Sequence, residues 1–232
     1  ARIFVDILFM FSKKNPEKYV KSFELRGWEN VEAALDQKKG VILFSAHFGN
    51  WEIVPYIISR KIGHNINSIA REMDNPYVEK RVKQFREFMG SSVISKRNSL
   101  RTILNRLQQN EIVYLLIDQN VIQREAVPVE FFGRNVRAVP SVSQLHIKKG
   151  IPAIPIFLHY EKERIILEVL KPLSLERSGD DTADIQQLTQ ISTSIIEEKI
   201  KQYPEQWFWF HDRWKKGQKD TVQRGFKEEK QP

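Results

Sequence analysis

The chain has 232 residues, of which 41% are hydrophobic and 28% charged, so it is long enough for one α/β domain with a sizeable core. It contains no cysteine, which excludes disulfide bonds, thiolate metal sites and cysteine nucleophiles. Lys and Arg number 37 against 29 Asp and Glu, and the resulting net charge of +8 favours a polyanionic partner such as nucleic acid, anionic lipid or an acidic protein.

The N-terminal segment, residues 1–14, has an apolar stripe followed by two lysines. Its apolar run is interrupted by Asp6 and is far shorter than the ~20 residues that span a bilayer. No signal-peptide cleavage pattern is present, and we expect the natural protein to extend upstream of Ala1. Helical spacing within the stripe predicts an amphipathic helix that lies on a membrane surface or docks on the domain. The stripe consists of Ile3, Phe4, Ile7, Leu8 and Phe11.

From residue 29 onward, predicted helices alternate with apolar strands. Helices are expected at 29–39, 51–62, 77–90, around 100–107, at 139–150 and at 184–202. Strands are expected at 41–46, 66–71, 91–95, 111–118, 151–160 and 164–173, with an extended edge at 127–133. This alternation predicts an α/β fold in which a mainly parallel sheet carries helices on both faces. We expect a single domain over 1–232 with the N-terminal helix at one end and a frayed tail at 217–232.

Three reactive side chains directly follow predicted strands: His47, Arg71 and Asp118. In sheets of this kind, ligands bind beyond the carboxyl ends of the strands. Glu52 follows His47 by five positions at the start of a helix, where the helix dipole favours an ionised carboxylate. A neutral imidazole held by a carboxylate can take a proton from a substrate hydroxyl. The alternative interpretations are a buried structural histidine, a surface ion pair for Arg71 and a turn cap for Asp118.

Several common sites are missing from the sequence: G-x-S-x-G, G-x-x-x-x-G-K-[ST], G-x-G-x-x-G and H-E-x-x-H. No second histidine lies at a helical or strand-alternate spacing from His47, so we expect no metal site and no cofactor. Without a serine or cysteine nucleophile, the activated group would belong to the substrate. The residues therefore favour direct acyl transfer from an activated ester to an alcohol, with slow hydrolysis as a side reaction.

The stretch "HFGNWE" resembles the H-x-x-x-x-[D/E] motif of glycerolipid-type acyltransferases. Its aromatic-rich form is similar to that of the lipid A biosynthesis lauroyl/myristoyl acyltransferase family, within the lysophospholipid acyltransferase-like superfamily. The resemblance continues in family order over roughly residues 20–216. It includes "AREMDNP", "LLIDQN", "VPVEFFGR", "VPSVSQLHIKKGIPAIPIF" and "YPEQWFWFHDRWK".

This resemblance implies that His47 is the general base and Glu52 its orienting partner. It implies that Arg71 meets a phosphate or shapes the active centre and that Asp118 belongs to the same site. Other superfamily members have a "FPEGTR"-like block where this chain has "LIDQN". We also expect substrate contacts from three residues within or next to the matching blocks, Asn50, Gln119 and Arg137.

The implied donor is an acyl thioester on acyl carrier protein or coenzyme A. The implied acceptor is a phosphorylated glycolipid such as a lipid A precursor, with a mannosylated phosphoinositide or a lysophospholipid as alternatives. The implied location is the cytoplasmic face of the bacterial inner membrane, where the protein would be peripheral or anchored through the N-terminus. A different class would be a non-catalytic module that binds lipid or another polyanion; because no nucleic-acid-binding motif is present, we expect no nucleic-acid partner.

Two further segments have open interpretations. Residues 79–106 hold eight basic side chains against two acidic ones, which predicts a solvated helix face or a docking surface for acyl carrier protein or anionic lipid. On the docking hypothesis, charge reversal at Arg81 and Arg86 would raise the donor KM. The aromatic residues of 207–214 could pack on the sheet or form a membrane-interface belt, and apolar residues on both faces favour packing. The remaining histidines, at 64, 146, 159 and 211, are interpreted as structural.

Overall fold

The computed structural model describes residues 23–70, 73–95, 99–120, 126–162, 164–210 and 212–214. The predicted helix at 1–14, the tail at 217–232, Arg71 and His211 lie outside these ranges. Within them, seven strands form one sheet, and two more form a separate hairpin.

The large sheet is mainly parallel, as predicted. Along the sheet the strands are β1 (Phe23–Arg26), β9 (Arg164–Val169), β8 (Ala153–Glu161), β2 (Val41–Ser45), β5 (Ile112–Leu116), β3 (Ile66–Ala70) and β4 (Ser91–Ser95). Five adjacent strands, β8, β2, β5, β3 and β4, all run parallel to one another. β9 turns back antiparallel to β8, and β1 runs parallel to β9. The carboxyl ends of five strands thus lie at one edge of the sheet.

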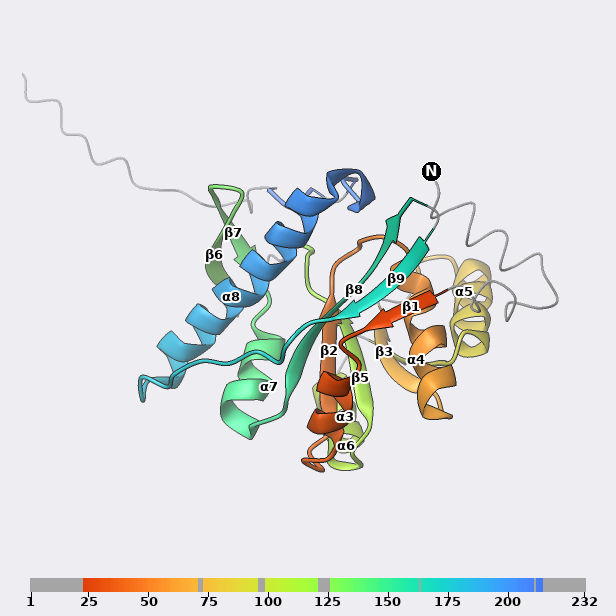
Figure 1. Ribbon diagram of the computed structural model, residues 1–232, viewed down its shortest axis with the longest axis horizontal. Coiled ribbons are helices and arrows are strands. Elements are labelled where there is room, and N and C mark those ends of the chain that lie inside the picture. The colour runs from red at the N-terminus through yellow and green to blue at the C-terminus, as the bar shows by residue number, and fades with distance from the viewer. Residues whose placement is uncertain are drawn as a thin grey trace, which may run out of the picture.

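Helices cover both faces, which confirms the predicted layers (Figure 1). The helices α3 (Glu29–Leu35), α4 (Val54–Ile62) and α5 (Pro76–Phe88) pack on one face. The helices α6 (Ser99–Gln108), α7 (Ser141–Lys149) and α8 (Asp181–Gln202) pack on the other. Pro76 opens α5, and the Asn75 side chain accepts hydrogen bonds from two backbone N–H groups of its first turn.

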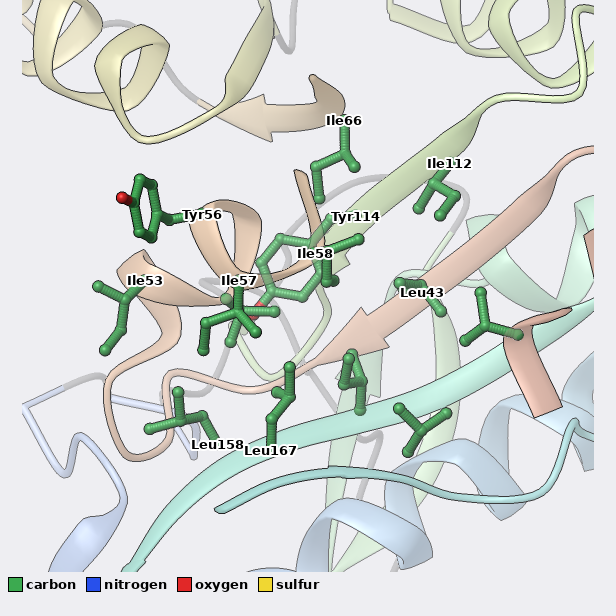
Figure 2. Close-up of a cluster of buried hydrophobic side chains, with 14 of the residues drawn as sticks. Leu43, Ile53, Tyr56, Ile57, Ile58, Ile66, Ile112, Tyr114, Leu158 and Leu167 are labelled. Atoms are coloured by element: carbon green, nitrogen blue, oxygen red, sulfur yellow. The ribbon is translucent and has the colours of Figure 1, made fainter. Parts of the chain in front are cut away.

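The central strand β2 shows why continuous apolar runs form these strands. Its side chains alternate between the two faces: Val41 and Leu43 enter one core cluster, and Ile42 and Phe44 enter the other. All four are fully buried. Figure 2 shows the first cluster, in which Ile57 and Ile58 of α4 lie over Leu43 and its neighbours.

The sequence did not predict two strands. β1 is only four residues long and contains Glu24 and Arg26, so its pattern is weak. The predicted edge at 127–133 pairs with a further strand, so that β6 (Val127–Phe131) and β7 (Arg134–Ala138) form an antiparallel hairpin. Phe132 and Gly133 connect the two strands with φ angles of 51° and 69°, as a two-residue hairpin turn requires. The hairpin packs against the C-terminal half of α8 in a third core cluster.

Candidate active site

His47 and Asp118 lie side by side at the carboxyl edge of the sheet. β2 and β5 are parallel with Ser45 opposite Leu116, so residues two positions further along each strand also face each other. The ring Nδ1 of His47 lies 2.7 Å from Oδ1 of Asp118, and the backbone N–H of His47 donates to Oδ2 over 2.9 Å. The structure therefore brings these two strand-end residues into direct contact, and their membership of one functional site stays a prediction.

The Asp118 carboxylate is completely buried, yet it is held ionised. Burial alone would raise its pKa, because a low-dielectric surrounding disfavours the charged form. Hydrogen bonds from His47 and from Nε1 of Trp207, the latter 2.9 Å from Oδ2, outweigh burial and hold the pKa of Asp118 below its usual value. Since an ionised carboxylate only accepts hydrogen bonds, Nδ1 of His47 carries a proton, so that the neutral form of the ring has its lone pair on Nε2.

The backbone after β2 turns so sharply that only glycine fits at position 49. Gly49 has a φ of +54°, and a Cβ atom there would lie 1.8 Å from the carbonyl oxygen of Leu158. The turn is fastened to the C-terminal aromatic block by backbone hydrogen bonds: Gly49 donates to Gln206 and Phe208 donates to His47. The block thus closes over the strand that carries His47, which explains how Trp207 reaches Asp118.

The imidazole of His47 is partly accessible, with 14% of its side chain exposed. Trp51 meets the ring edge-on at 5.0 Å between centroids, and Phe208 lies against Trp51. The amide nitrogen of Gln119 lies 3.4 Å from Nε2, so Gln119 adjoins the nitrogen that would accept a proton. Asp118 therefore holds Nδ1 of the ring, the Gln119 amide lies at Nε2, and the ring remains partly exposed.

Glu52 does not occupy the position predicted for it. The carboxylate on Nδ1 of His47 is Asp118, whereas Glu52 binds Arg86 of α5 through both of its oxygens, at 2.7 and 3.2 Å. The interpretation of Glu52 as the orienting partner of His47 is therefore corrected. The short 3-10 turn Trp51–Ile53 directs the Glu52 side chain toward α5. Burial alone would lower the pKa of Arg86, but the hydrogen bonds to Glu52 outweigh it and raise that pKa.

A narrow cavity opens beside the Glu52–Arg86 pair. It lies between α4, α5 and the strands β3, β4 and β5, and Trp51 separates it from His47. Ser68 and Ser91 line it, and neither buried hydroxyl has a hydrogen-bond partner in the part of the chain that the structure describes. The cavity is therefore mixed in character, with apolar walls, two hydroxyls and a charged pair.

Arg213 is a component of the site that the sequence did not single out. Its guanidinium is almost completely buried and donates to the backbone carbonyls of Gln119 and Arg137. Burial lowers the pKa of Arg213 to about 10, while the nearby Asp118 charge acts in the opposite direction. The residue lies in the quoted block "WFWFHDRWK", but only the fold brings it to the loop after β5.

Among the described residues, the structure shows no hydrogen bond from the side chains of the other predicted substrate-binding residues, Asn50 and Arg137, to His47 or Asp118. The Asn50 side chain has no exposed surface, and neither of its amide atoms has a hydrogen-bond partner among the described residues. Arg137 is exposed on β7 and donates to the carbonyl oxygen of Ala126. Arg71 lies outside the described residues, so its proposed phosphate contact stays a prediction.

The basic stretch 79–106 is not one uniform surface. Lys80, Arg81, Lys83 and Arg101 are exposed, whereas Arg86 is half-buried on Glu52. Arg106 forms an ion pair with Glu111. Arg86 therefore does not belong to an exposed docking face, and a charge reversal there would disrupt the Glu52 ion pair instead.

The aromatic block divides in a similar way. Trp207 is buried in the third core cluster, and Trp214 packs against it, as predicted. Trp209 and Phe210 are instead 51% and 89% exposed.

In the described part of the chain, no group of three or more His, Cys, Asp or Glu residues could hold a metal ion. No helix within that part is both long and apolar enough to cross a membrane.

The family model for bacterial lipid A biosynthesis acyltransferases matches residues 1–216. The chain belongs to this family.

Several curated relatives are similar over most of the chain. The chain is 25% identical over 190 residues to a phosphatidylinositol mannoside acyltransferase of Mycolicibacterium smegmatis. The matched region covers 80% of this chain and 60% of that protein. It is 25% identical over 201 residues to a lipid A biosynthesis acyltransferase of Haemophilus influenzae, covering 85% and 60%. It is 20% identical over 199 residues to a lipid A biosynthesis myristoyltransferase of Escherichia coli, covering 84% and 60%. The chain thus spans about three fifths of the length of each of these relatives.

Proposed function

We propose that the protein is an O-acyltransferase that moves a fatty acyl chain from a thioester to a hydroxyl group of a phosphorylated glycolipid. The observation that carries this proposal is the His47–Asp118 pair, in which one imidazole nitrogen is held at 2.7 Å by a buried carboxylate. The other nitrogen adjoins Gln119 in a ring that remains partly accessible. Family membership supports the same chemistry.

In the proposed reaction, Nε2 of His47 takes the proton of the acceptor hydroxyl as its oxygen attacks the thioester carbonyl carbon. A C–O bond forms, the C–S bond breaks, and the thiolate leaves with the proton that the imidazolium returns. Asp118 stabilises the imidazolium and fixes the tautomer, as a carboxylate on a general-base histidine does. Trp207 and Arg213 hold Asp118 and the adjoining loop in position.

The acceptor that we propose is a lipid A precursor, with a mannosylated phosphoinositide as the second candidate. Relatives named for each of these two pathways match the chain at the same 25% identity, which supports the glycolipid class but does not separate its members. The donor we propose is a thioester of acyl carrier protein, or alternatively of coenzyme A. Arg71 and Arg137 are proposed to bind acceptor phosphate, because one guanidinium group can donate two parallel hydrogen bonds to two phosphate oxygens.

Both substrates can be identified in one experiment. The protein is incubated with bacterial lipid extracts that contain each glycolipid class, and with mixed chain lengths loaded on acyl carrier protein or on coenzyme A. Mass spectrometry then detects a lipid that is heavier by one acyl group. Wild type should form it and His47→Ala should not, while His64→Ala, which alters an exposed histidine in the turn between α4 and β3, should match wild type.

The possible outcomes separate the parts of the proposal. Equal product from wild type and His47→Ala would show that His47 is not the base. No product from wild type with either donor, in any of the extracts, would contradict the proposed transferase. The mass of the product names the acceptor and the chain length together.

A further inference from the structure

Large exposed hydrophobic side chains are concentrated at one edge of the molecule. In the described ranges, seven such residues are exposed: four follow the carboxyl ends of parallel strands, and two more adjoin the segment that is hydrogen-bonded to residues 47–49 after β2. We name these six the collar: Met73, Tyr77, Val78, Leu100, Trp209 and Phe210. The seventh, Phe88, lies at the far end of α5, next to the start of β4.

The topology explains why the collar residues share an edge although they are distant in sequence. Met73, Tyr77 and Val78 follow β3, and Leu100 follows β4 at the start of α6. Trp209 and Phe210 follow the segment that is hydrogen-bonded to residues 47–49 after β2. These three strands are linked by parallel pairing through β5, so their carboxyl ends lie on the same side (Figure 1). His47 lies at this same edge.

The exposure of these side chains contrasts with the tight burial of most of the other large apolar residues. Tyr77 is 81% exposed and Phe210 is 89% exposed, although the core of the protein buries most of its large apolar residues completely. Several exposed apolar side chains on one edge of a protein indicate a surface that meets another apolar phase or a partner.

Among the described residues at this edge, charges of both signs lie between the apolar side chains. The exposed cations Lys80, Arg81 and Arg101 are accompanied by the acidic residues Asp74, Glu79 and Asp212. These described charges form no uniformly positive patch, on which docking of an acidic carrier protein would rely. Apolar and aromatic side chains with interspersed cations are instead typical of surfaces that sit at the headgroup level of a bilayer.

We infer that the collar docks directly on a lipid bilayer, so that the edge of the sheet that carries His47 faces the layer that holds the acceptor. The choice of a lipid occupant rests in part on the proposed function, since the acceptor in that proposal is a membrane glycolipid. The contact is made by the folded domain itself and is separate from any contribution of residues 1–14. It is driven mainly by burial of apolar surface.

The absence of cysteine from the chain allows a direct test. Single variants Tyr77→Cys, Phe210→Cys and the control Phe88→Cys are made in the full chain and labelled with a polarity-sensitive fluorophore. Vesicles of phosphatidylethanolamine and phosphatidylglycerol are added in low and in high salt. We expect a blue-shifted emission, quenched by brominated acyl chains, at positions 77 and 210 in both salt conditions and no change at position 88.

Several results would overturn the inference. One is an unchanged emission at positions 77 and 210, and another is an equal shift at position 88. A shift that disappears in high salt would indicate an electrostatic contact, because screening weakens attraction between exposed charges. A shift produced by acyl carrier protein without vesicles would make the edge a protein-docking surface.

A second measurement separates docking from catalysis. The double variant Tyr77→Ser/Phe210→Ser should transfer acyl groups to acceptor in vesicles about tenfold more slowly, because it loses the burial of two aromatic rings. With acceptor dispersed in detergent it should match wild type. If the labels shift but wild type transfers nothing, the docking inference holds and the proposed function fails; if transfer occurs without a shift, the reverse is true.

Discussion

The described part of the chain contains two histidine–carboxylate pairs that differ in one decisive respect. His47 binds Asp118 at the carboxyl edge of the sheet, and His159 of β8 lies 3.3 Å from Glu161 through Nε2. The 203–214 segment contributes an aromatic partner to both carboxylates. Trp207 donates to Asp118, and the hydroxyl of Tyr203 donates to Glu161.

The difference lies in the second nitrogen of each ring. His159 is only 1% exposed and stacks on Tyr203, and its Nδ1 has no hydrogen-bond partner among the described residues. Burial lowers the pKa of His159, so this imidazole is neutral but closed to substrate. His47 combines a held Nδ1 with a ring that is partly exposed. A histidine–carboxylate pair therefore indicates a general base only where the second nitrogen can meet a substrate.

Substitution of each carboxylate by the corresponding amide should produce the largest difference in kcat between the two pairs. Asp118→Asn keeps the shape of the side chain but offers an amide in place of an acceptor, so the tautomer of His47 is no longer fixed. We expect kcat to fall by about 10⁴-fold, the size of the effect of the same change in serine proteases. Glu161→Gln should leave kcat unchanged, and equal losses in both variants would refute the division between the pairs. Steady-state kinetics with saturating donor measures this.

The aromatic donors should show a smaller contrast. Trp207→Phe removes one hydrogen bond from the buried Asp118 while it keeps a ring in the core. We expect about a tenfold loss in kcat and a loss of about 1–3 kcal/mol in the free energy of unfolding, because the carboxylate loses a donor in a dry site. The matched change Tyr203→Phe removes the bond to Glu161, and we expect it to affect stability alone. Urea denaturation alongside kinetics separates the two effects.

Glu52 tests whether the position of a carboxylate, and not only its proximity in sequence, decides its role. Because Glu52 binds Arg86, Glu52→Gln should weaken that ion pair and cost about 1–3 kcal/mol of stability. Its effect on kcat should stay below about tenfold, far less than that of Asp118→Asn. A larger loss in Glu52→Gln than in Asp118→Asn would restore Glu52 as the orienting residue. Kinetics of both variants in one assay decides this.

The sequence predicted the parallel sheet and placed His47 and Asp118 at the carboxyl ends of strands, but it did not predict their direct contact. Apolar strands that alternate with helices leave few arrangements open, and all of those place strand ends together. β1 and β7 were missed because their short, charged sequences have little apolar periodicity. Pairing with β9 and β6 stabilises these strands, and such pairing is not visible in a single short segment.

The assignment of Glu52 failed for a different physical reason. A spacing of five residues gives proximity along the chain but does not specify the direction of a side chain in a 3-10 turn. The competing partner, Arg86, is 34 residues away on α5. Trp207 and Arg213 are more distant still, 89 and 94 residues from the groups that they bind. Contacts of this range depend on the finished fold, so local pattern cannot reveal them.

The two pairs should also respond to pH in different windows. Because burial holds the pKa of His159 below its ordinary 6.5, the unfolded chain binds a proton at this residue before the folded protein does. The stability that neutral His159 contributes is therefore lost as the pH falls below 6.5. His159→Gln should show a smaller loss of unfolding free energy than wild type over this range, as measured by urea denaturation.

Asp118 provides the internal comparison for that measurement. Its pKa lies below the ordinary 3.8, so its contribution is complete above that pH and is lost only as the pH falls through the lower folded value. The stability difference between wild type and Asp118→Asn should thus stay constant from neutral pH down to about pH 5 and shrink below about pH 4. A difference that already shrinks between pH 7 and 6 would mean that Asp118 is not held ionised by its hydrogen bonds. It would place both pairs in the same class of buried, structural contacts.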